Sequence, residues 1–327
     1  MAKRVLLSLF TILVATTITF VLVHNLPGDV FVPMAMDMAQ EQSIPFEIAL
    51  ETVRGLYGMP ALDQPLYRQY FDYISRLFRG DLGESMLYHT PVIKIIASAL
   101  PWTILVQVMG ITLSFTIGTL IGMVAAWKRR GWLDTFVSAY SSITDATPDY
   151  LTALILLIVF AVNLKWLPLK GAYDVDVRPG VNLRFVLNVL YHAVLPMATY
   201  TLEGMGGWML IMKSNAVSTV AQDYVKAAQA KGLRDRRIAI NYVGRNAILA
   251  PVTSLAIAFG TMLGGATLIE SVFAYPGIGF FFGEALKRRD YSLMQGLFLL
   301  TTVGIILANF LADWLYARLD PRVRAGG

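Results

Sequence analysis

Long apolar runs without charge constrain this chain more than any other feature of its sequence. Val5–Val23 holds no charged residue, and neither does Thr103–Trp127. A run of roughly 20 mostly apolar residues is long enough to cross the hydrocarbon core of a bilayer. The backbone has no water to bind there, so such a run folds as a helix. With 327 residues and 56% hydrophobic content, the chain is too apolar for a soluble domain of its size.

The pattern predicts six membrane-spanning helices. They are expected at 5–23, 103–127, 136–162, 192–212, 248–273 and 293–316. The third extends a short apolar stretch, Leu151–Val162, back to about Phe136, and Pro148 should kink or restart that helix. A cleaved signal peptide is the alternative for the first span. Residues 24–29 lack a small-x-small cleavage pattern, so we take this span as an uncleaved anchor.

The cations predict the orientation of these spans. With the N-terminus inside, fifteen of the 27 Lys and Arg residues fall in short inner segments, as the positive-inside rule requires. The inner cations are Lys3, Arg4, Lys128, Arg129, Arg130, Arg318, Arg322, Arg324 and seven residues within 213–248. The outer cluster Lys287-Arg288-Arg289 departs from this trend and is a candidate contact surface, partly offset by Glu284 and Asp290. Both termini are therefore predicted to be cytoplasmic.

The long outer segment 24–100 is expected to fold as a small helical cap near the membrane surface. Helical spacing of apolar residues appears in Ile44–Tyr57 and again in Gln69–Arg79. Gly80–Gly83 then marks a turn. We therefore divide the chain into residues 1–100, an anchor helix plus an extracytoplasmic helical segment, and residues 101–327, a five-helix core with a cytoplasmic loop at 213–248.

Several chemistries are missing from the sequence. The chain has no Cys and three His, and it contains no phosphate-binding loop, zinc-protease motif or hydrolase nucleophile motif. We therefore predict no catalytic residue, no metal site and no bound ATP. The net charge of +5 follows from topology, so no nucleic-acid partner is expected. The glycine pairs Gly206-Gly207 and Gly264-Gly265 are interpreted as close helix packing.

Two acids lie inside predicted spans, where an ionisable group is a functional candidate. Glu203 falls in the fourth span. Three roles are open for its side chain: a hydrogen bond to a neighbouring helix, a place in the wall of a water-filled cavity, or binding of an amine-bearing or polar solute. Glu270 lies near the outer end of the fifth span, where we expect it to reach the surface or pair with an outer cation. Both are candidates for a translocation pathway.

Within 213–248, residues 223–232 form the most specific pattern. Tyr224, Ala227, Ala228 and Lys231 recur at three- and four-residue spacing, which predicts a short helix with a small-residue face. Asp223 in the first turn suits the helix dipole, and Gly232 suits a left-handed stop. Small side chains let a partner surface approach the backbone. This segment is therefore predicted to be a docking helix.

The segment resembles the inner-loop motif E-A-A-x-x-x-G of the permease subunits of ATP-binding-cassette importers. Aligning Gly232 places Lys226-Ala227-Ala228 on the first three positions, so a lysine replaces the acid. That departure is usual in the dipeptide/oligopeptide branch. Other segments also resemble that branch and occur in the same order along the chain: Leu62–Leu66, Gly80–Ser85, Arg245–Ala247, Glu270–Gly279 and Leu319–Arg322. The resemblance covers nearly the whole chain and points to the first of the two permeases in such systems.

The resemblance implies an all-α membrane protein with the type I importer permease fold, in a prokaryotic plasma (inner) membrane. Its implied partners are a second homologous permease, two ATPase subunits that carry ATP and Mg, an extracytoplasmic solute-binding protein and the lipid bilayer. The implied ATPase-coupling residues are Asp223, Tyr224, Lys226, Ala227, Ala228, Ala230, Lys231, Gly232 and Leu233. A receptor-facing loop is expected at Tyr275, Pro276, Gly277 and Gly279. The subunit itself would be non-catalytic.

Alternatives stay open at this point. Relatives in the branch carry peptides, and some carry oligosaccharides or nickel complexes, so the solute is not fixed by the sequence. A stand-alone secondary transporter would need intramembrane charge chains or inverted repeats, and only scattered acids are present. An intramembrane enzyme would need a nucleophile–base pair, and none is found. A passive scaffold subunit is the remaining alternative.

Overall fold

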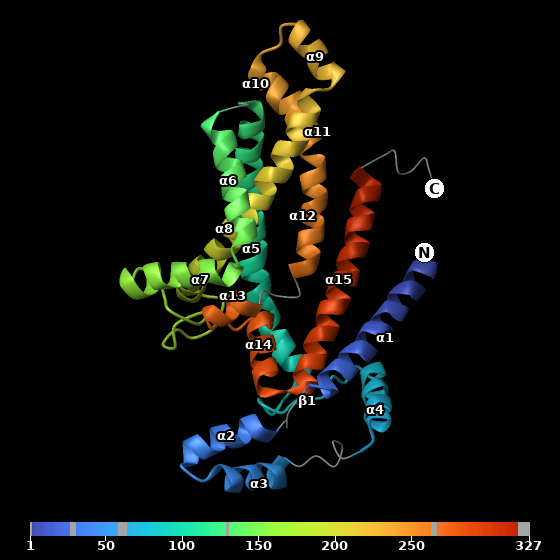
Figure 1. Cartoon of the computed structure of the whole chain (residues 1–327), viewed down its shortest axis with the longest axis vertical. Coiled ribbons are helices and arrows are strands. Elements are labelled where there is room, and N and C mark those ends of the chain that lie inside the picture. The colour runs from blue at the N-terminus through green and yellow to red at the C-terminus, as the bar shows by residue number, and fades with distance from the viewer. Residues whose placement is uncertain (1, 27–30, 58–63, 129–130, 263–266, 320–327) are drawn as a thin grey trace. The chain divides into compact units, whose positions relative to one another are not determined.

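The structure is a computed structural model that describes residues 2–26, 31–57, 64–128, 131–262 and 267–319. In this part of the chain almost everything is helical, with one two-stranded hairpin (Figure 1). Parts of the sequence patterns lie outside the described residues, namely 62–63, 129–130, 264–265 and 320–324. The all-helical fold class is confirmed.

The chain divides into two compact units. One holds residues 1–101 and 280–303, and the other holds 102–279 and 304–327. Three helices run from one unit into the other: α5 (Val92–Trp127), α14 (Ile278–Arg288) and α15 (Tyr291–Leu319). The division into 1–100 and 101–327 stays a prediction.

The first unit contains short helices after the N-terminal helix. Its further elements are α1 (Ala2–His24), α2 (Phe31–Gln42), α3 (Phe46–Tyr57), α4 (Leu66–Phe78), β1 (Glu84–Ser85) and β2 (Thr90–Pro91). The helices predicted in 44–57 and 69–79 are present, whereas α2 was missed. Helices α2 and α3 pack around Ala35, Ala49 and Val53, which are at most 1% exposed.

Helix α4 is tied to α1 by aromatic contacts. Phe20 of α1 stacks on Tyr73 of α4 with ring centroids 5.7 Å apart. Thr17 and Tyr70 share a hydrogen bond of 2.8 Å between their hydroxyl groups. Tyr73 is buried on the predicted stripe, and burial raises its pKa to about 12. The outer segment therefore packs back on the anchor helix in this unit.

The second unit contains the remaining helices and two π-helical segments. They are α6 (Trp132–Ala146), α7 (Asp149–Leu156), η1 (Leu157–Asn163), α8 (Leu183–Val220), α9 (Asp223–Ala230), α10 (Asp235–Arg237), η2 (Ile238–Gly244), α11 (Arg245–Ala247), α12 (Leu249–Thr261) and α13 (Thr267–Val272). Helix α8 begins where the Asn182 side chain accepts the amide of Phe185 at 2.8 Å, an N-cap bond.

Among the described residues, three helices are long and apolar enough to cross a membrane: Leu6–His24, Val92–Trp127 and Leu183–Val220. Two bent pairs raise this to five if each pair is one span, namely Trp132–Ala146 with Asp149–Asn163 and Asp235–Ala247 with Leu249–Thr261. The apolar part of α15, Tyr291–Leu307, is shorter. The predicted count of six spans and the orientation of the termini stay predictions.

The third predicted span is broken, as expected from its proline. Helix α6 ends at Ala146, and Pro148 precedes α7 in an extended conformation with ψ of 133°. A proline disfavours the helical region for the residue before it, and Thr147 is extended, with ψ of 123°. The two parts meet at 100°, so α7 lies across the direction of α6 (Figure 1).

Glycines let the long helices of the second unit approach closely. A Cβ on Gly122 of α5 would come within 2.4 Å of the Met209 carbonyl oxygen of α8, and one on Gly118 within 2.7 Å of Trp208. Gly206 of α8 meets α6 in the same way, with Thr144 Oγ1 at 2.2 Å from the ideal Cβ. The packing interpretation is confirmed for Gly206 but not for Gly207, which has no neighbour within 4 Å.

The segment 213–248 is not a loop. Helix α8 continues to Val220, and α9, α10, η2 and α11 follow with short connections. The reason is that its apolar residues are buried together: Val225 and Val243 are fully buried, and Ile238 is 1% exposed. The polar composition that marks this segment in the sequence belongs to its exposed faces only.

Candidate functional site

Helix α9 forms where the sequence predicts the docking helix, at one end of the second unit (Figure 1). Asp223 in its first turn forms an exposed ion pair with Lys226 at 3.0 Å. Gly232 follows with φ of +70°, the left-handed conformation that ends many helices and that glycine adopts without strain. The predicted helix and its glycine stop are confirmed.

Side chains on one face of α9 fix it to the rest of the unit. Val225 is fully buried and Ala228 is 2% exposed. They belong to one apolar cluster with Ala126 of α5, Met212 of α8 and Ile238 of η2. This cluster, which we name the α9 anchor, packs α9 against the ends of α5 and α8 and against η2.

The opposite face of α9 is open. Tyr224 is 43% exposed, and Ala227 and Lys231 are also exposed. Ala228 was predicted to share this face, and that placement is wrong. Successive helical residues point about 100° apart, so Ala228 turns inward when Ala227 turns outward. The available docking surface is therefore Tyr224, Ala227, Ala230 and Lys231.

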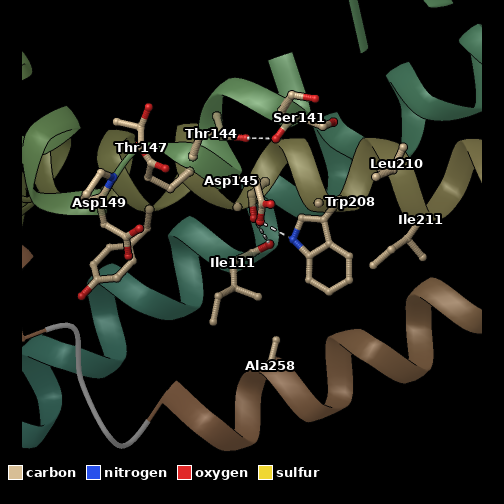
Figure 2. Close-up of a pocket in the computed structure, with 18 of the residues that line it drawn as sticks. Ile111, Ser141, Thr144, Asp145, Thr147, Asp149, Trp208, Leu210, Ile211 and Ala258 are labelled. Carbon is tan, nitrogen blue, oxygen red and sulfur yellow. Dashed lines mark hydrogen bonds between the residues drawn. The ribbon is translucent and has the colours of Figure 1, made fainter. Parts of the chain in front are cut away.

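A cavity of about 950 Å³ lies among α5, α6, α8 and α12 of the second unit. Ile111 of α5 and Ala258 of α12 point toward one another across it (Figure 2). Trp208 of α8 is held in its wall, because its indole N–H donates to Ser114 Oγ at 3.1 Å. Hydroxyl side chains of α6, including Ser141, line the wall beside them (Figure 2).

Acids line this cavity. Asp145 and Asp149 flank the break between α6 and α7, and Glu203 of α8 is half-buried in the wall. No cation stands among the described lining residues. Lys213 lies at the edge, where it pairs with Asp134 and donates to a lining serine at 2.9 Å. The structure thus places Glu203 at a cavity wall and gives the cavity a negative character.

Glu270 is the main correction to the sequence analysis. It is fully buried and does not reach the surface. Thr103 Oγ1 donates to its Oε1 at 2.9 Å, and the amide of Gly279 donates to its Oε2 at 2.8 Å. The amide of Ile278 completes the group by donating to Thr103 Oγ1 at 2.7 Å. A buried carboxylate is stable here because fixed donors at a helix start replace water.

The expected receptor-facing loop is largely interior. Tyr275 is fully buried, and Gly277 and Gly279 are also buried, whereas Pro276 is partly exposed. Burial raises the pKa of the Tyr275 hydroxyl. Tyr275 meets the Trp102 ring edge-on, with centroids 6.1 Å apart. The receptor role of these residues stays a prediction, and their burial speaks against it.

Asp290 is predicted to offset the charge of the neighbouring cations, but in the structure its carboxylate accepts hydrogen bonds from two elements. It is 1% exposed and caps α15 by accepting the amide of Leu293 at 3.0 Å. Its other oxygen accepts the Ser85 hydroxyl and the Leu87 amide, at 3.1 Å for the amide. Asp290 therefore holds the hairpin of the first unit to α15. The position of an acid directly before an apolar helix was the available signal.

Two cations in the last turn of α14 are paired within their own unit. Lys287 pairs with Glu284 at 3.1 Å, and Arg288 pairs with Asp37 of α2. Two of the three charges in the proposed contact cluster are thus partly neutralised. This makes the cluster a weaker candidate for a partner surface.

A family of known proteins matches this chain. The profile of the family described as "binding-protein-dependent transport system inner membrane component" matches residues 118–325, which include α9 and most of the residues that line the cavity. The chain belongs to this family. The long apolar helices agree with a permease subunit of an ATP-binding-cassette importer.

Relatives of this permease match it end to end. The di/tripeptide transport system permease protein DppB of Pseudomonas aeruginosa is 32% identical over 99% of this chain and 98% of its own length. The oligopeptide permease AppB of Bacillus subtilis is 30% identical over 98% of both chains. The glutathione permease GsiC of Escherichia coli is 31% identical over 98% of this chain and 97% of its own.

Proposed function

We propose that this permease subunit forms half of the translocation pathway of an ATP-driven importer of short peptides. The observation that carries this function is α9, a helix whose inner face is locked into the α9 anchor and whose outer face is small and exposed. Such a helix suits docking to a second protein and transmission of its movement. The partner that moves it is an ATPase, in keeping with the family.

The coupling step follows from the way α9 is held. Tyr224 and Lys231 border the exposed face, and Ala227 lets the ATPase approach the backbone. When the two ATPases close on ATP, they displace α9, and the α9 anchor passes the movement to α5 and α8. These helices also form the cavity wall, so its access changes from one side of the membrane to the other.

The cavity supports peptides as the solute. Its volume of about 950 Å³ lies in the range of small-molecule sites. Asp145, Asp149 and Glu203 favour the ammonium group of a peptide by their negative charge, whereas Ile111 and Trp208 offer apolar surface for side chains. The relatives described above are named for di- and tripeptides, oligopeptides and glutathione, which agrees with this choice.

The proposed assembly contains this permease, a second homologous permease, two ATPase subunits and an extracytoplasmic solute-binding protein. ATP and Mg belong to the ATPases in this arrangement, and this chain is non-catalytic. The assembly lies in the inner membrane, where the chain crosses several times with α9 on the cytoplasmic side. The family description, which names a binding-protein-dependent system, supports the presence of the binding protein.

Co-purification and transport test this function together. Extracted in mild detergent, the permease should bring down an ATPase and a second permease. Reconstituted with the binding protein, the assembly should accumulate a labelled tripeptide only when ATP is supplied on the α9 side. Uptake without ATPase, driven by an ion gradient, would instead establish a stand-alone secondary transporter.

The cavity has its own test. Replacing Asp145 by Asn and Glu203 by Gln removes two charges from the cavity and should raise the peptide concentration needed for half-maximal uptake about tenfold. A contact to a charged group contributes roughly 1.5–3 kcal/mol, and the contribution is smaller here because both carboxylates are partly solvated. The matched control is Asp176→Asn in the segment before α8, where the acid is exposed and pairs with Arg184. Equal loss in both variants would contradict a role of the cavity in peptide binding.

A further inference from the structure

A second cavity, of about 660 Å³, lies where the end of α5 meets η2 and the start of α12. Its walls are almost entirely apolar, formed by Leu120, Met123, Val124, Ile240 and Ile248. All of these residues belong to the second unit. The cavity is separate from the one proposed for the solute, and its lining contains no acid. We name it the α5–η2 groove.

Three cations stand at the rim of the α5–η2 groove: Lys128, Arg236 and Arg245. Each is exposed. Within the described residues, no carboxylate forms an ion pair with any of the three. In contrast, Lys213 and Lys226 of the same unit are paired with acids. The rim is therefore a concentrated positive charge without a protein counterion.

The walls are open as well as apolar. Leu120 is 63% exposed, Val124 is 45% exposed and Ile240 is 56% exposed. Leu120 and Val124 lie on α5, one of the helices long and apolar enough to span the membrane. Lys128 directly follows the end of α5, Arg236 lies in α10, and Arg245 begins α11. The groove thus offers apolar contact at membrane depth and positive charge at the level of the headgroups.

We propose that the α5–η2 groove binds an anionic phospholipid, with an acyl chain between Leu120 and Ile240 and the phosphate among Lys128, Arg236 and Arg245. Basic pockets between membrane helices recognise anionic headgroups in this way. The charge complementarity selects a lipid over a protein helix, because an apolar helix would leave the three cations uncompensated. The site does not depend on which solute the permease carries.

The site also has a structural consequence. Ile240 and Arg236 flank Ile238, the η2 residue that is buried in the α9 anchor. Helix η2 contributes Ile240 and Gly244 to the groove and Ile238 and Val243 to the α9 anchor. A lipid bound in the groove therefore restrains η2 on the side opposite to α9. A ligand that binds only the folded state stabilises it, with a gain that grows as the logarithm of the ligand concentration, so the lipid should stabilise the assembly against heat.

The first experiment measures lipid retention by native mass spectrometry. The assembled transporter is equilibrated with equal amounts of phosphatidylglycerol and phosphatidylcholine. The wild type should retain phosphatidylglycerol preferentially and melt at a higher temperature with it. The variant Lys128→Gln/Arg236→Gln/Arg245→Gln should lose the preference, about fivefold for each cation, since a cation near an anionic surface contributes roughly 1 kcal/mol.

A matched control separates a site from general charge. Lys170→Gln/Arg234→Gln/Arg237→Gln removes the same charge from exposed positions that do not line the groove, and it should keep the lipid preference. If both triple variants lose retention equally, or if neither does, the proposal is overturned. Tripeptide transport by the wild type is measured beside them, so that failure of the lipid site and failure of the importer function give different results.

The rival occupant is the second permease. The chain has no Cys, so Leu120→Cys and, as a control, Val175→Cys each give a single reactive thiol. Val175 is fully exposed in the segment between η1 and α8. In the assembled transporter, a photo-cross-linker on the Leu120→Cys thiol should capture phospholipid and no subunit. Capture of the second permease from this position would show that the groove is a subunit interface and would refute the lipid site.

Discussion

At the scale of single residues, Glu270 organises the turn that leads into α14. Its two carboxylate oxygens accept from Thr103 and from the amide of Gly279, and Thr103 in turn accepts the amide of Ile278. Gly277 stands against this group without unusual backbone dihedrals. A Cβ on Gly277 would lie 2.3 Å from Glu270 Oε2 and 2.4 Å from Thr103 Oγ1. Close contact, rather than conformational freedom, therefore requires glycine here.

The first prediction follows from that contact. Gly277→Ala should lower the free energy of unfolding by about 1–3 kcal/mol, because the methyl group overpacks the site and displaces a buried hydrogen bond. Thermal unfolding in detergent measures the effect. Gly55→Ala in α3 is the control, since no atom lies within 4 Å of its Cβ position. Equal melting temperatures for the two variants would contradict the buried arrangement around Glu270.

At the scale of secondary-structure elements, α6 and α8 are held together by a glycine contact that has a natural control beside it. Gly206 faces α6, where Ser141 Oγ also donates to the Gly206 carbonyl at 2.7 Å. The next residue, Gly207, points into the solute cavity and meets nothing within 4 Å. Two neighbouring glycines of one helix therefore serve different purposes.

The second prediction compares these two positions. Gly206→Ala should destabilise the permease by about 1–3 kcal/mol through overpacking against Thr144. Gly207→Ala should be neutral or stabilising by up to about 1 kcal/mol, because alanine is the better helix former. Thermal unfolding of both variants in the same detergent gives the comparison. A loss of stability at Gly207 equal to that at Gly206 would contradict the described packing of α6 on α8.

Helix α9 is the element on which the function depends. Its stop at Gly232 has φ of +70° and open space around the Cβ position. A substitution there therefore acts through backbone conformation and not through a clash. The left-handed region costs an L-residue about 1–2 kcal/mol and is least unfavourable for asparagine.

The third prediction uses this difference. Gly232→Val should reposition the end of α9 and lower both ATPase retention and ATP-driven transport, whereas Gly232→Asn should retain most of both. Membrane insertion should be the same for both variants, which a membrane-fraction immunoblot verifies. Unchanged ATPase retention and transport in Gly232→Val would show that α9 is not the coupling element.

At the scale of the whole molecule, membrane topology decides on which side the docking face of α9 lies. The cavity proposed for the solute and the docking face of α9 belong to one unit. The proposed function requires α9 on the cytoplasmic side, and the cation distribution predicts it there. The segment between η1 and α8, which includes Val175, is expected on the other side.

The fourth prediction tests this arrangement in the naturally cysteine-free chain. A membrane-impermeant maleimide added to intact spheroplasts should label Val175→Cys, which is at a fully exposed position. It should label Gln222→Cys, at the exposed start of α9, only after the membrane is permeabilised. The opposite pattern would invert the topology and with it the proposed coupling side.

Some features of the fold were predictable from local sequence patterns. The broken third span was predictable because proline acts on its immediate neighbours, and α9 was predictable because its spacing and glycine stop are local. Ala228 was misplaced because adjacent small residues look alike in a sequence, while only contact with Val225 and Ile238 decides which one turns inward. Within 213–248 only the helix at 223–232 was predicted, and the helical parts around it were missed because a helix with polar exposed faces has the composition of a loop.

The sequence by itself determined that the chain lies in a membrane, where its longest apolar helices fall and that a short helix stops before Gly232. Apolar length, cation placement and a helix stop depend only on residues close together in the chain. The tertiary structure alone decided the roles of Glu270 and Asp290. Their partners Thr103 and Ser85 lie 167 and 205 positions away in the sequence. Whether a carboxylate reaches water or is buried depends on which donors the fold brings to it.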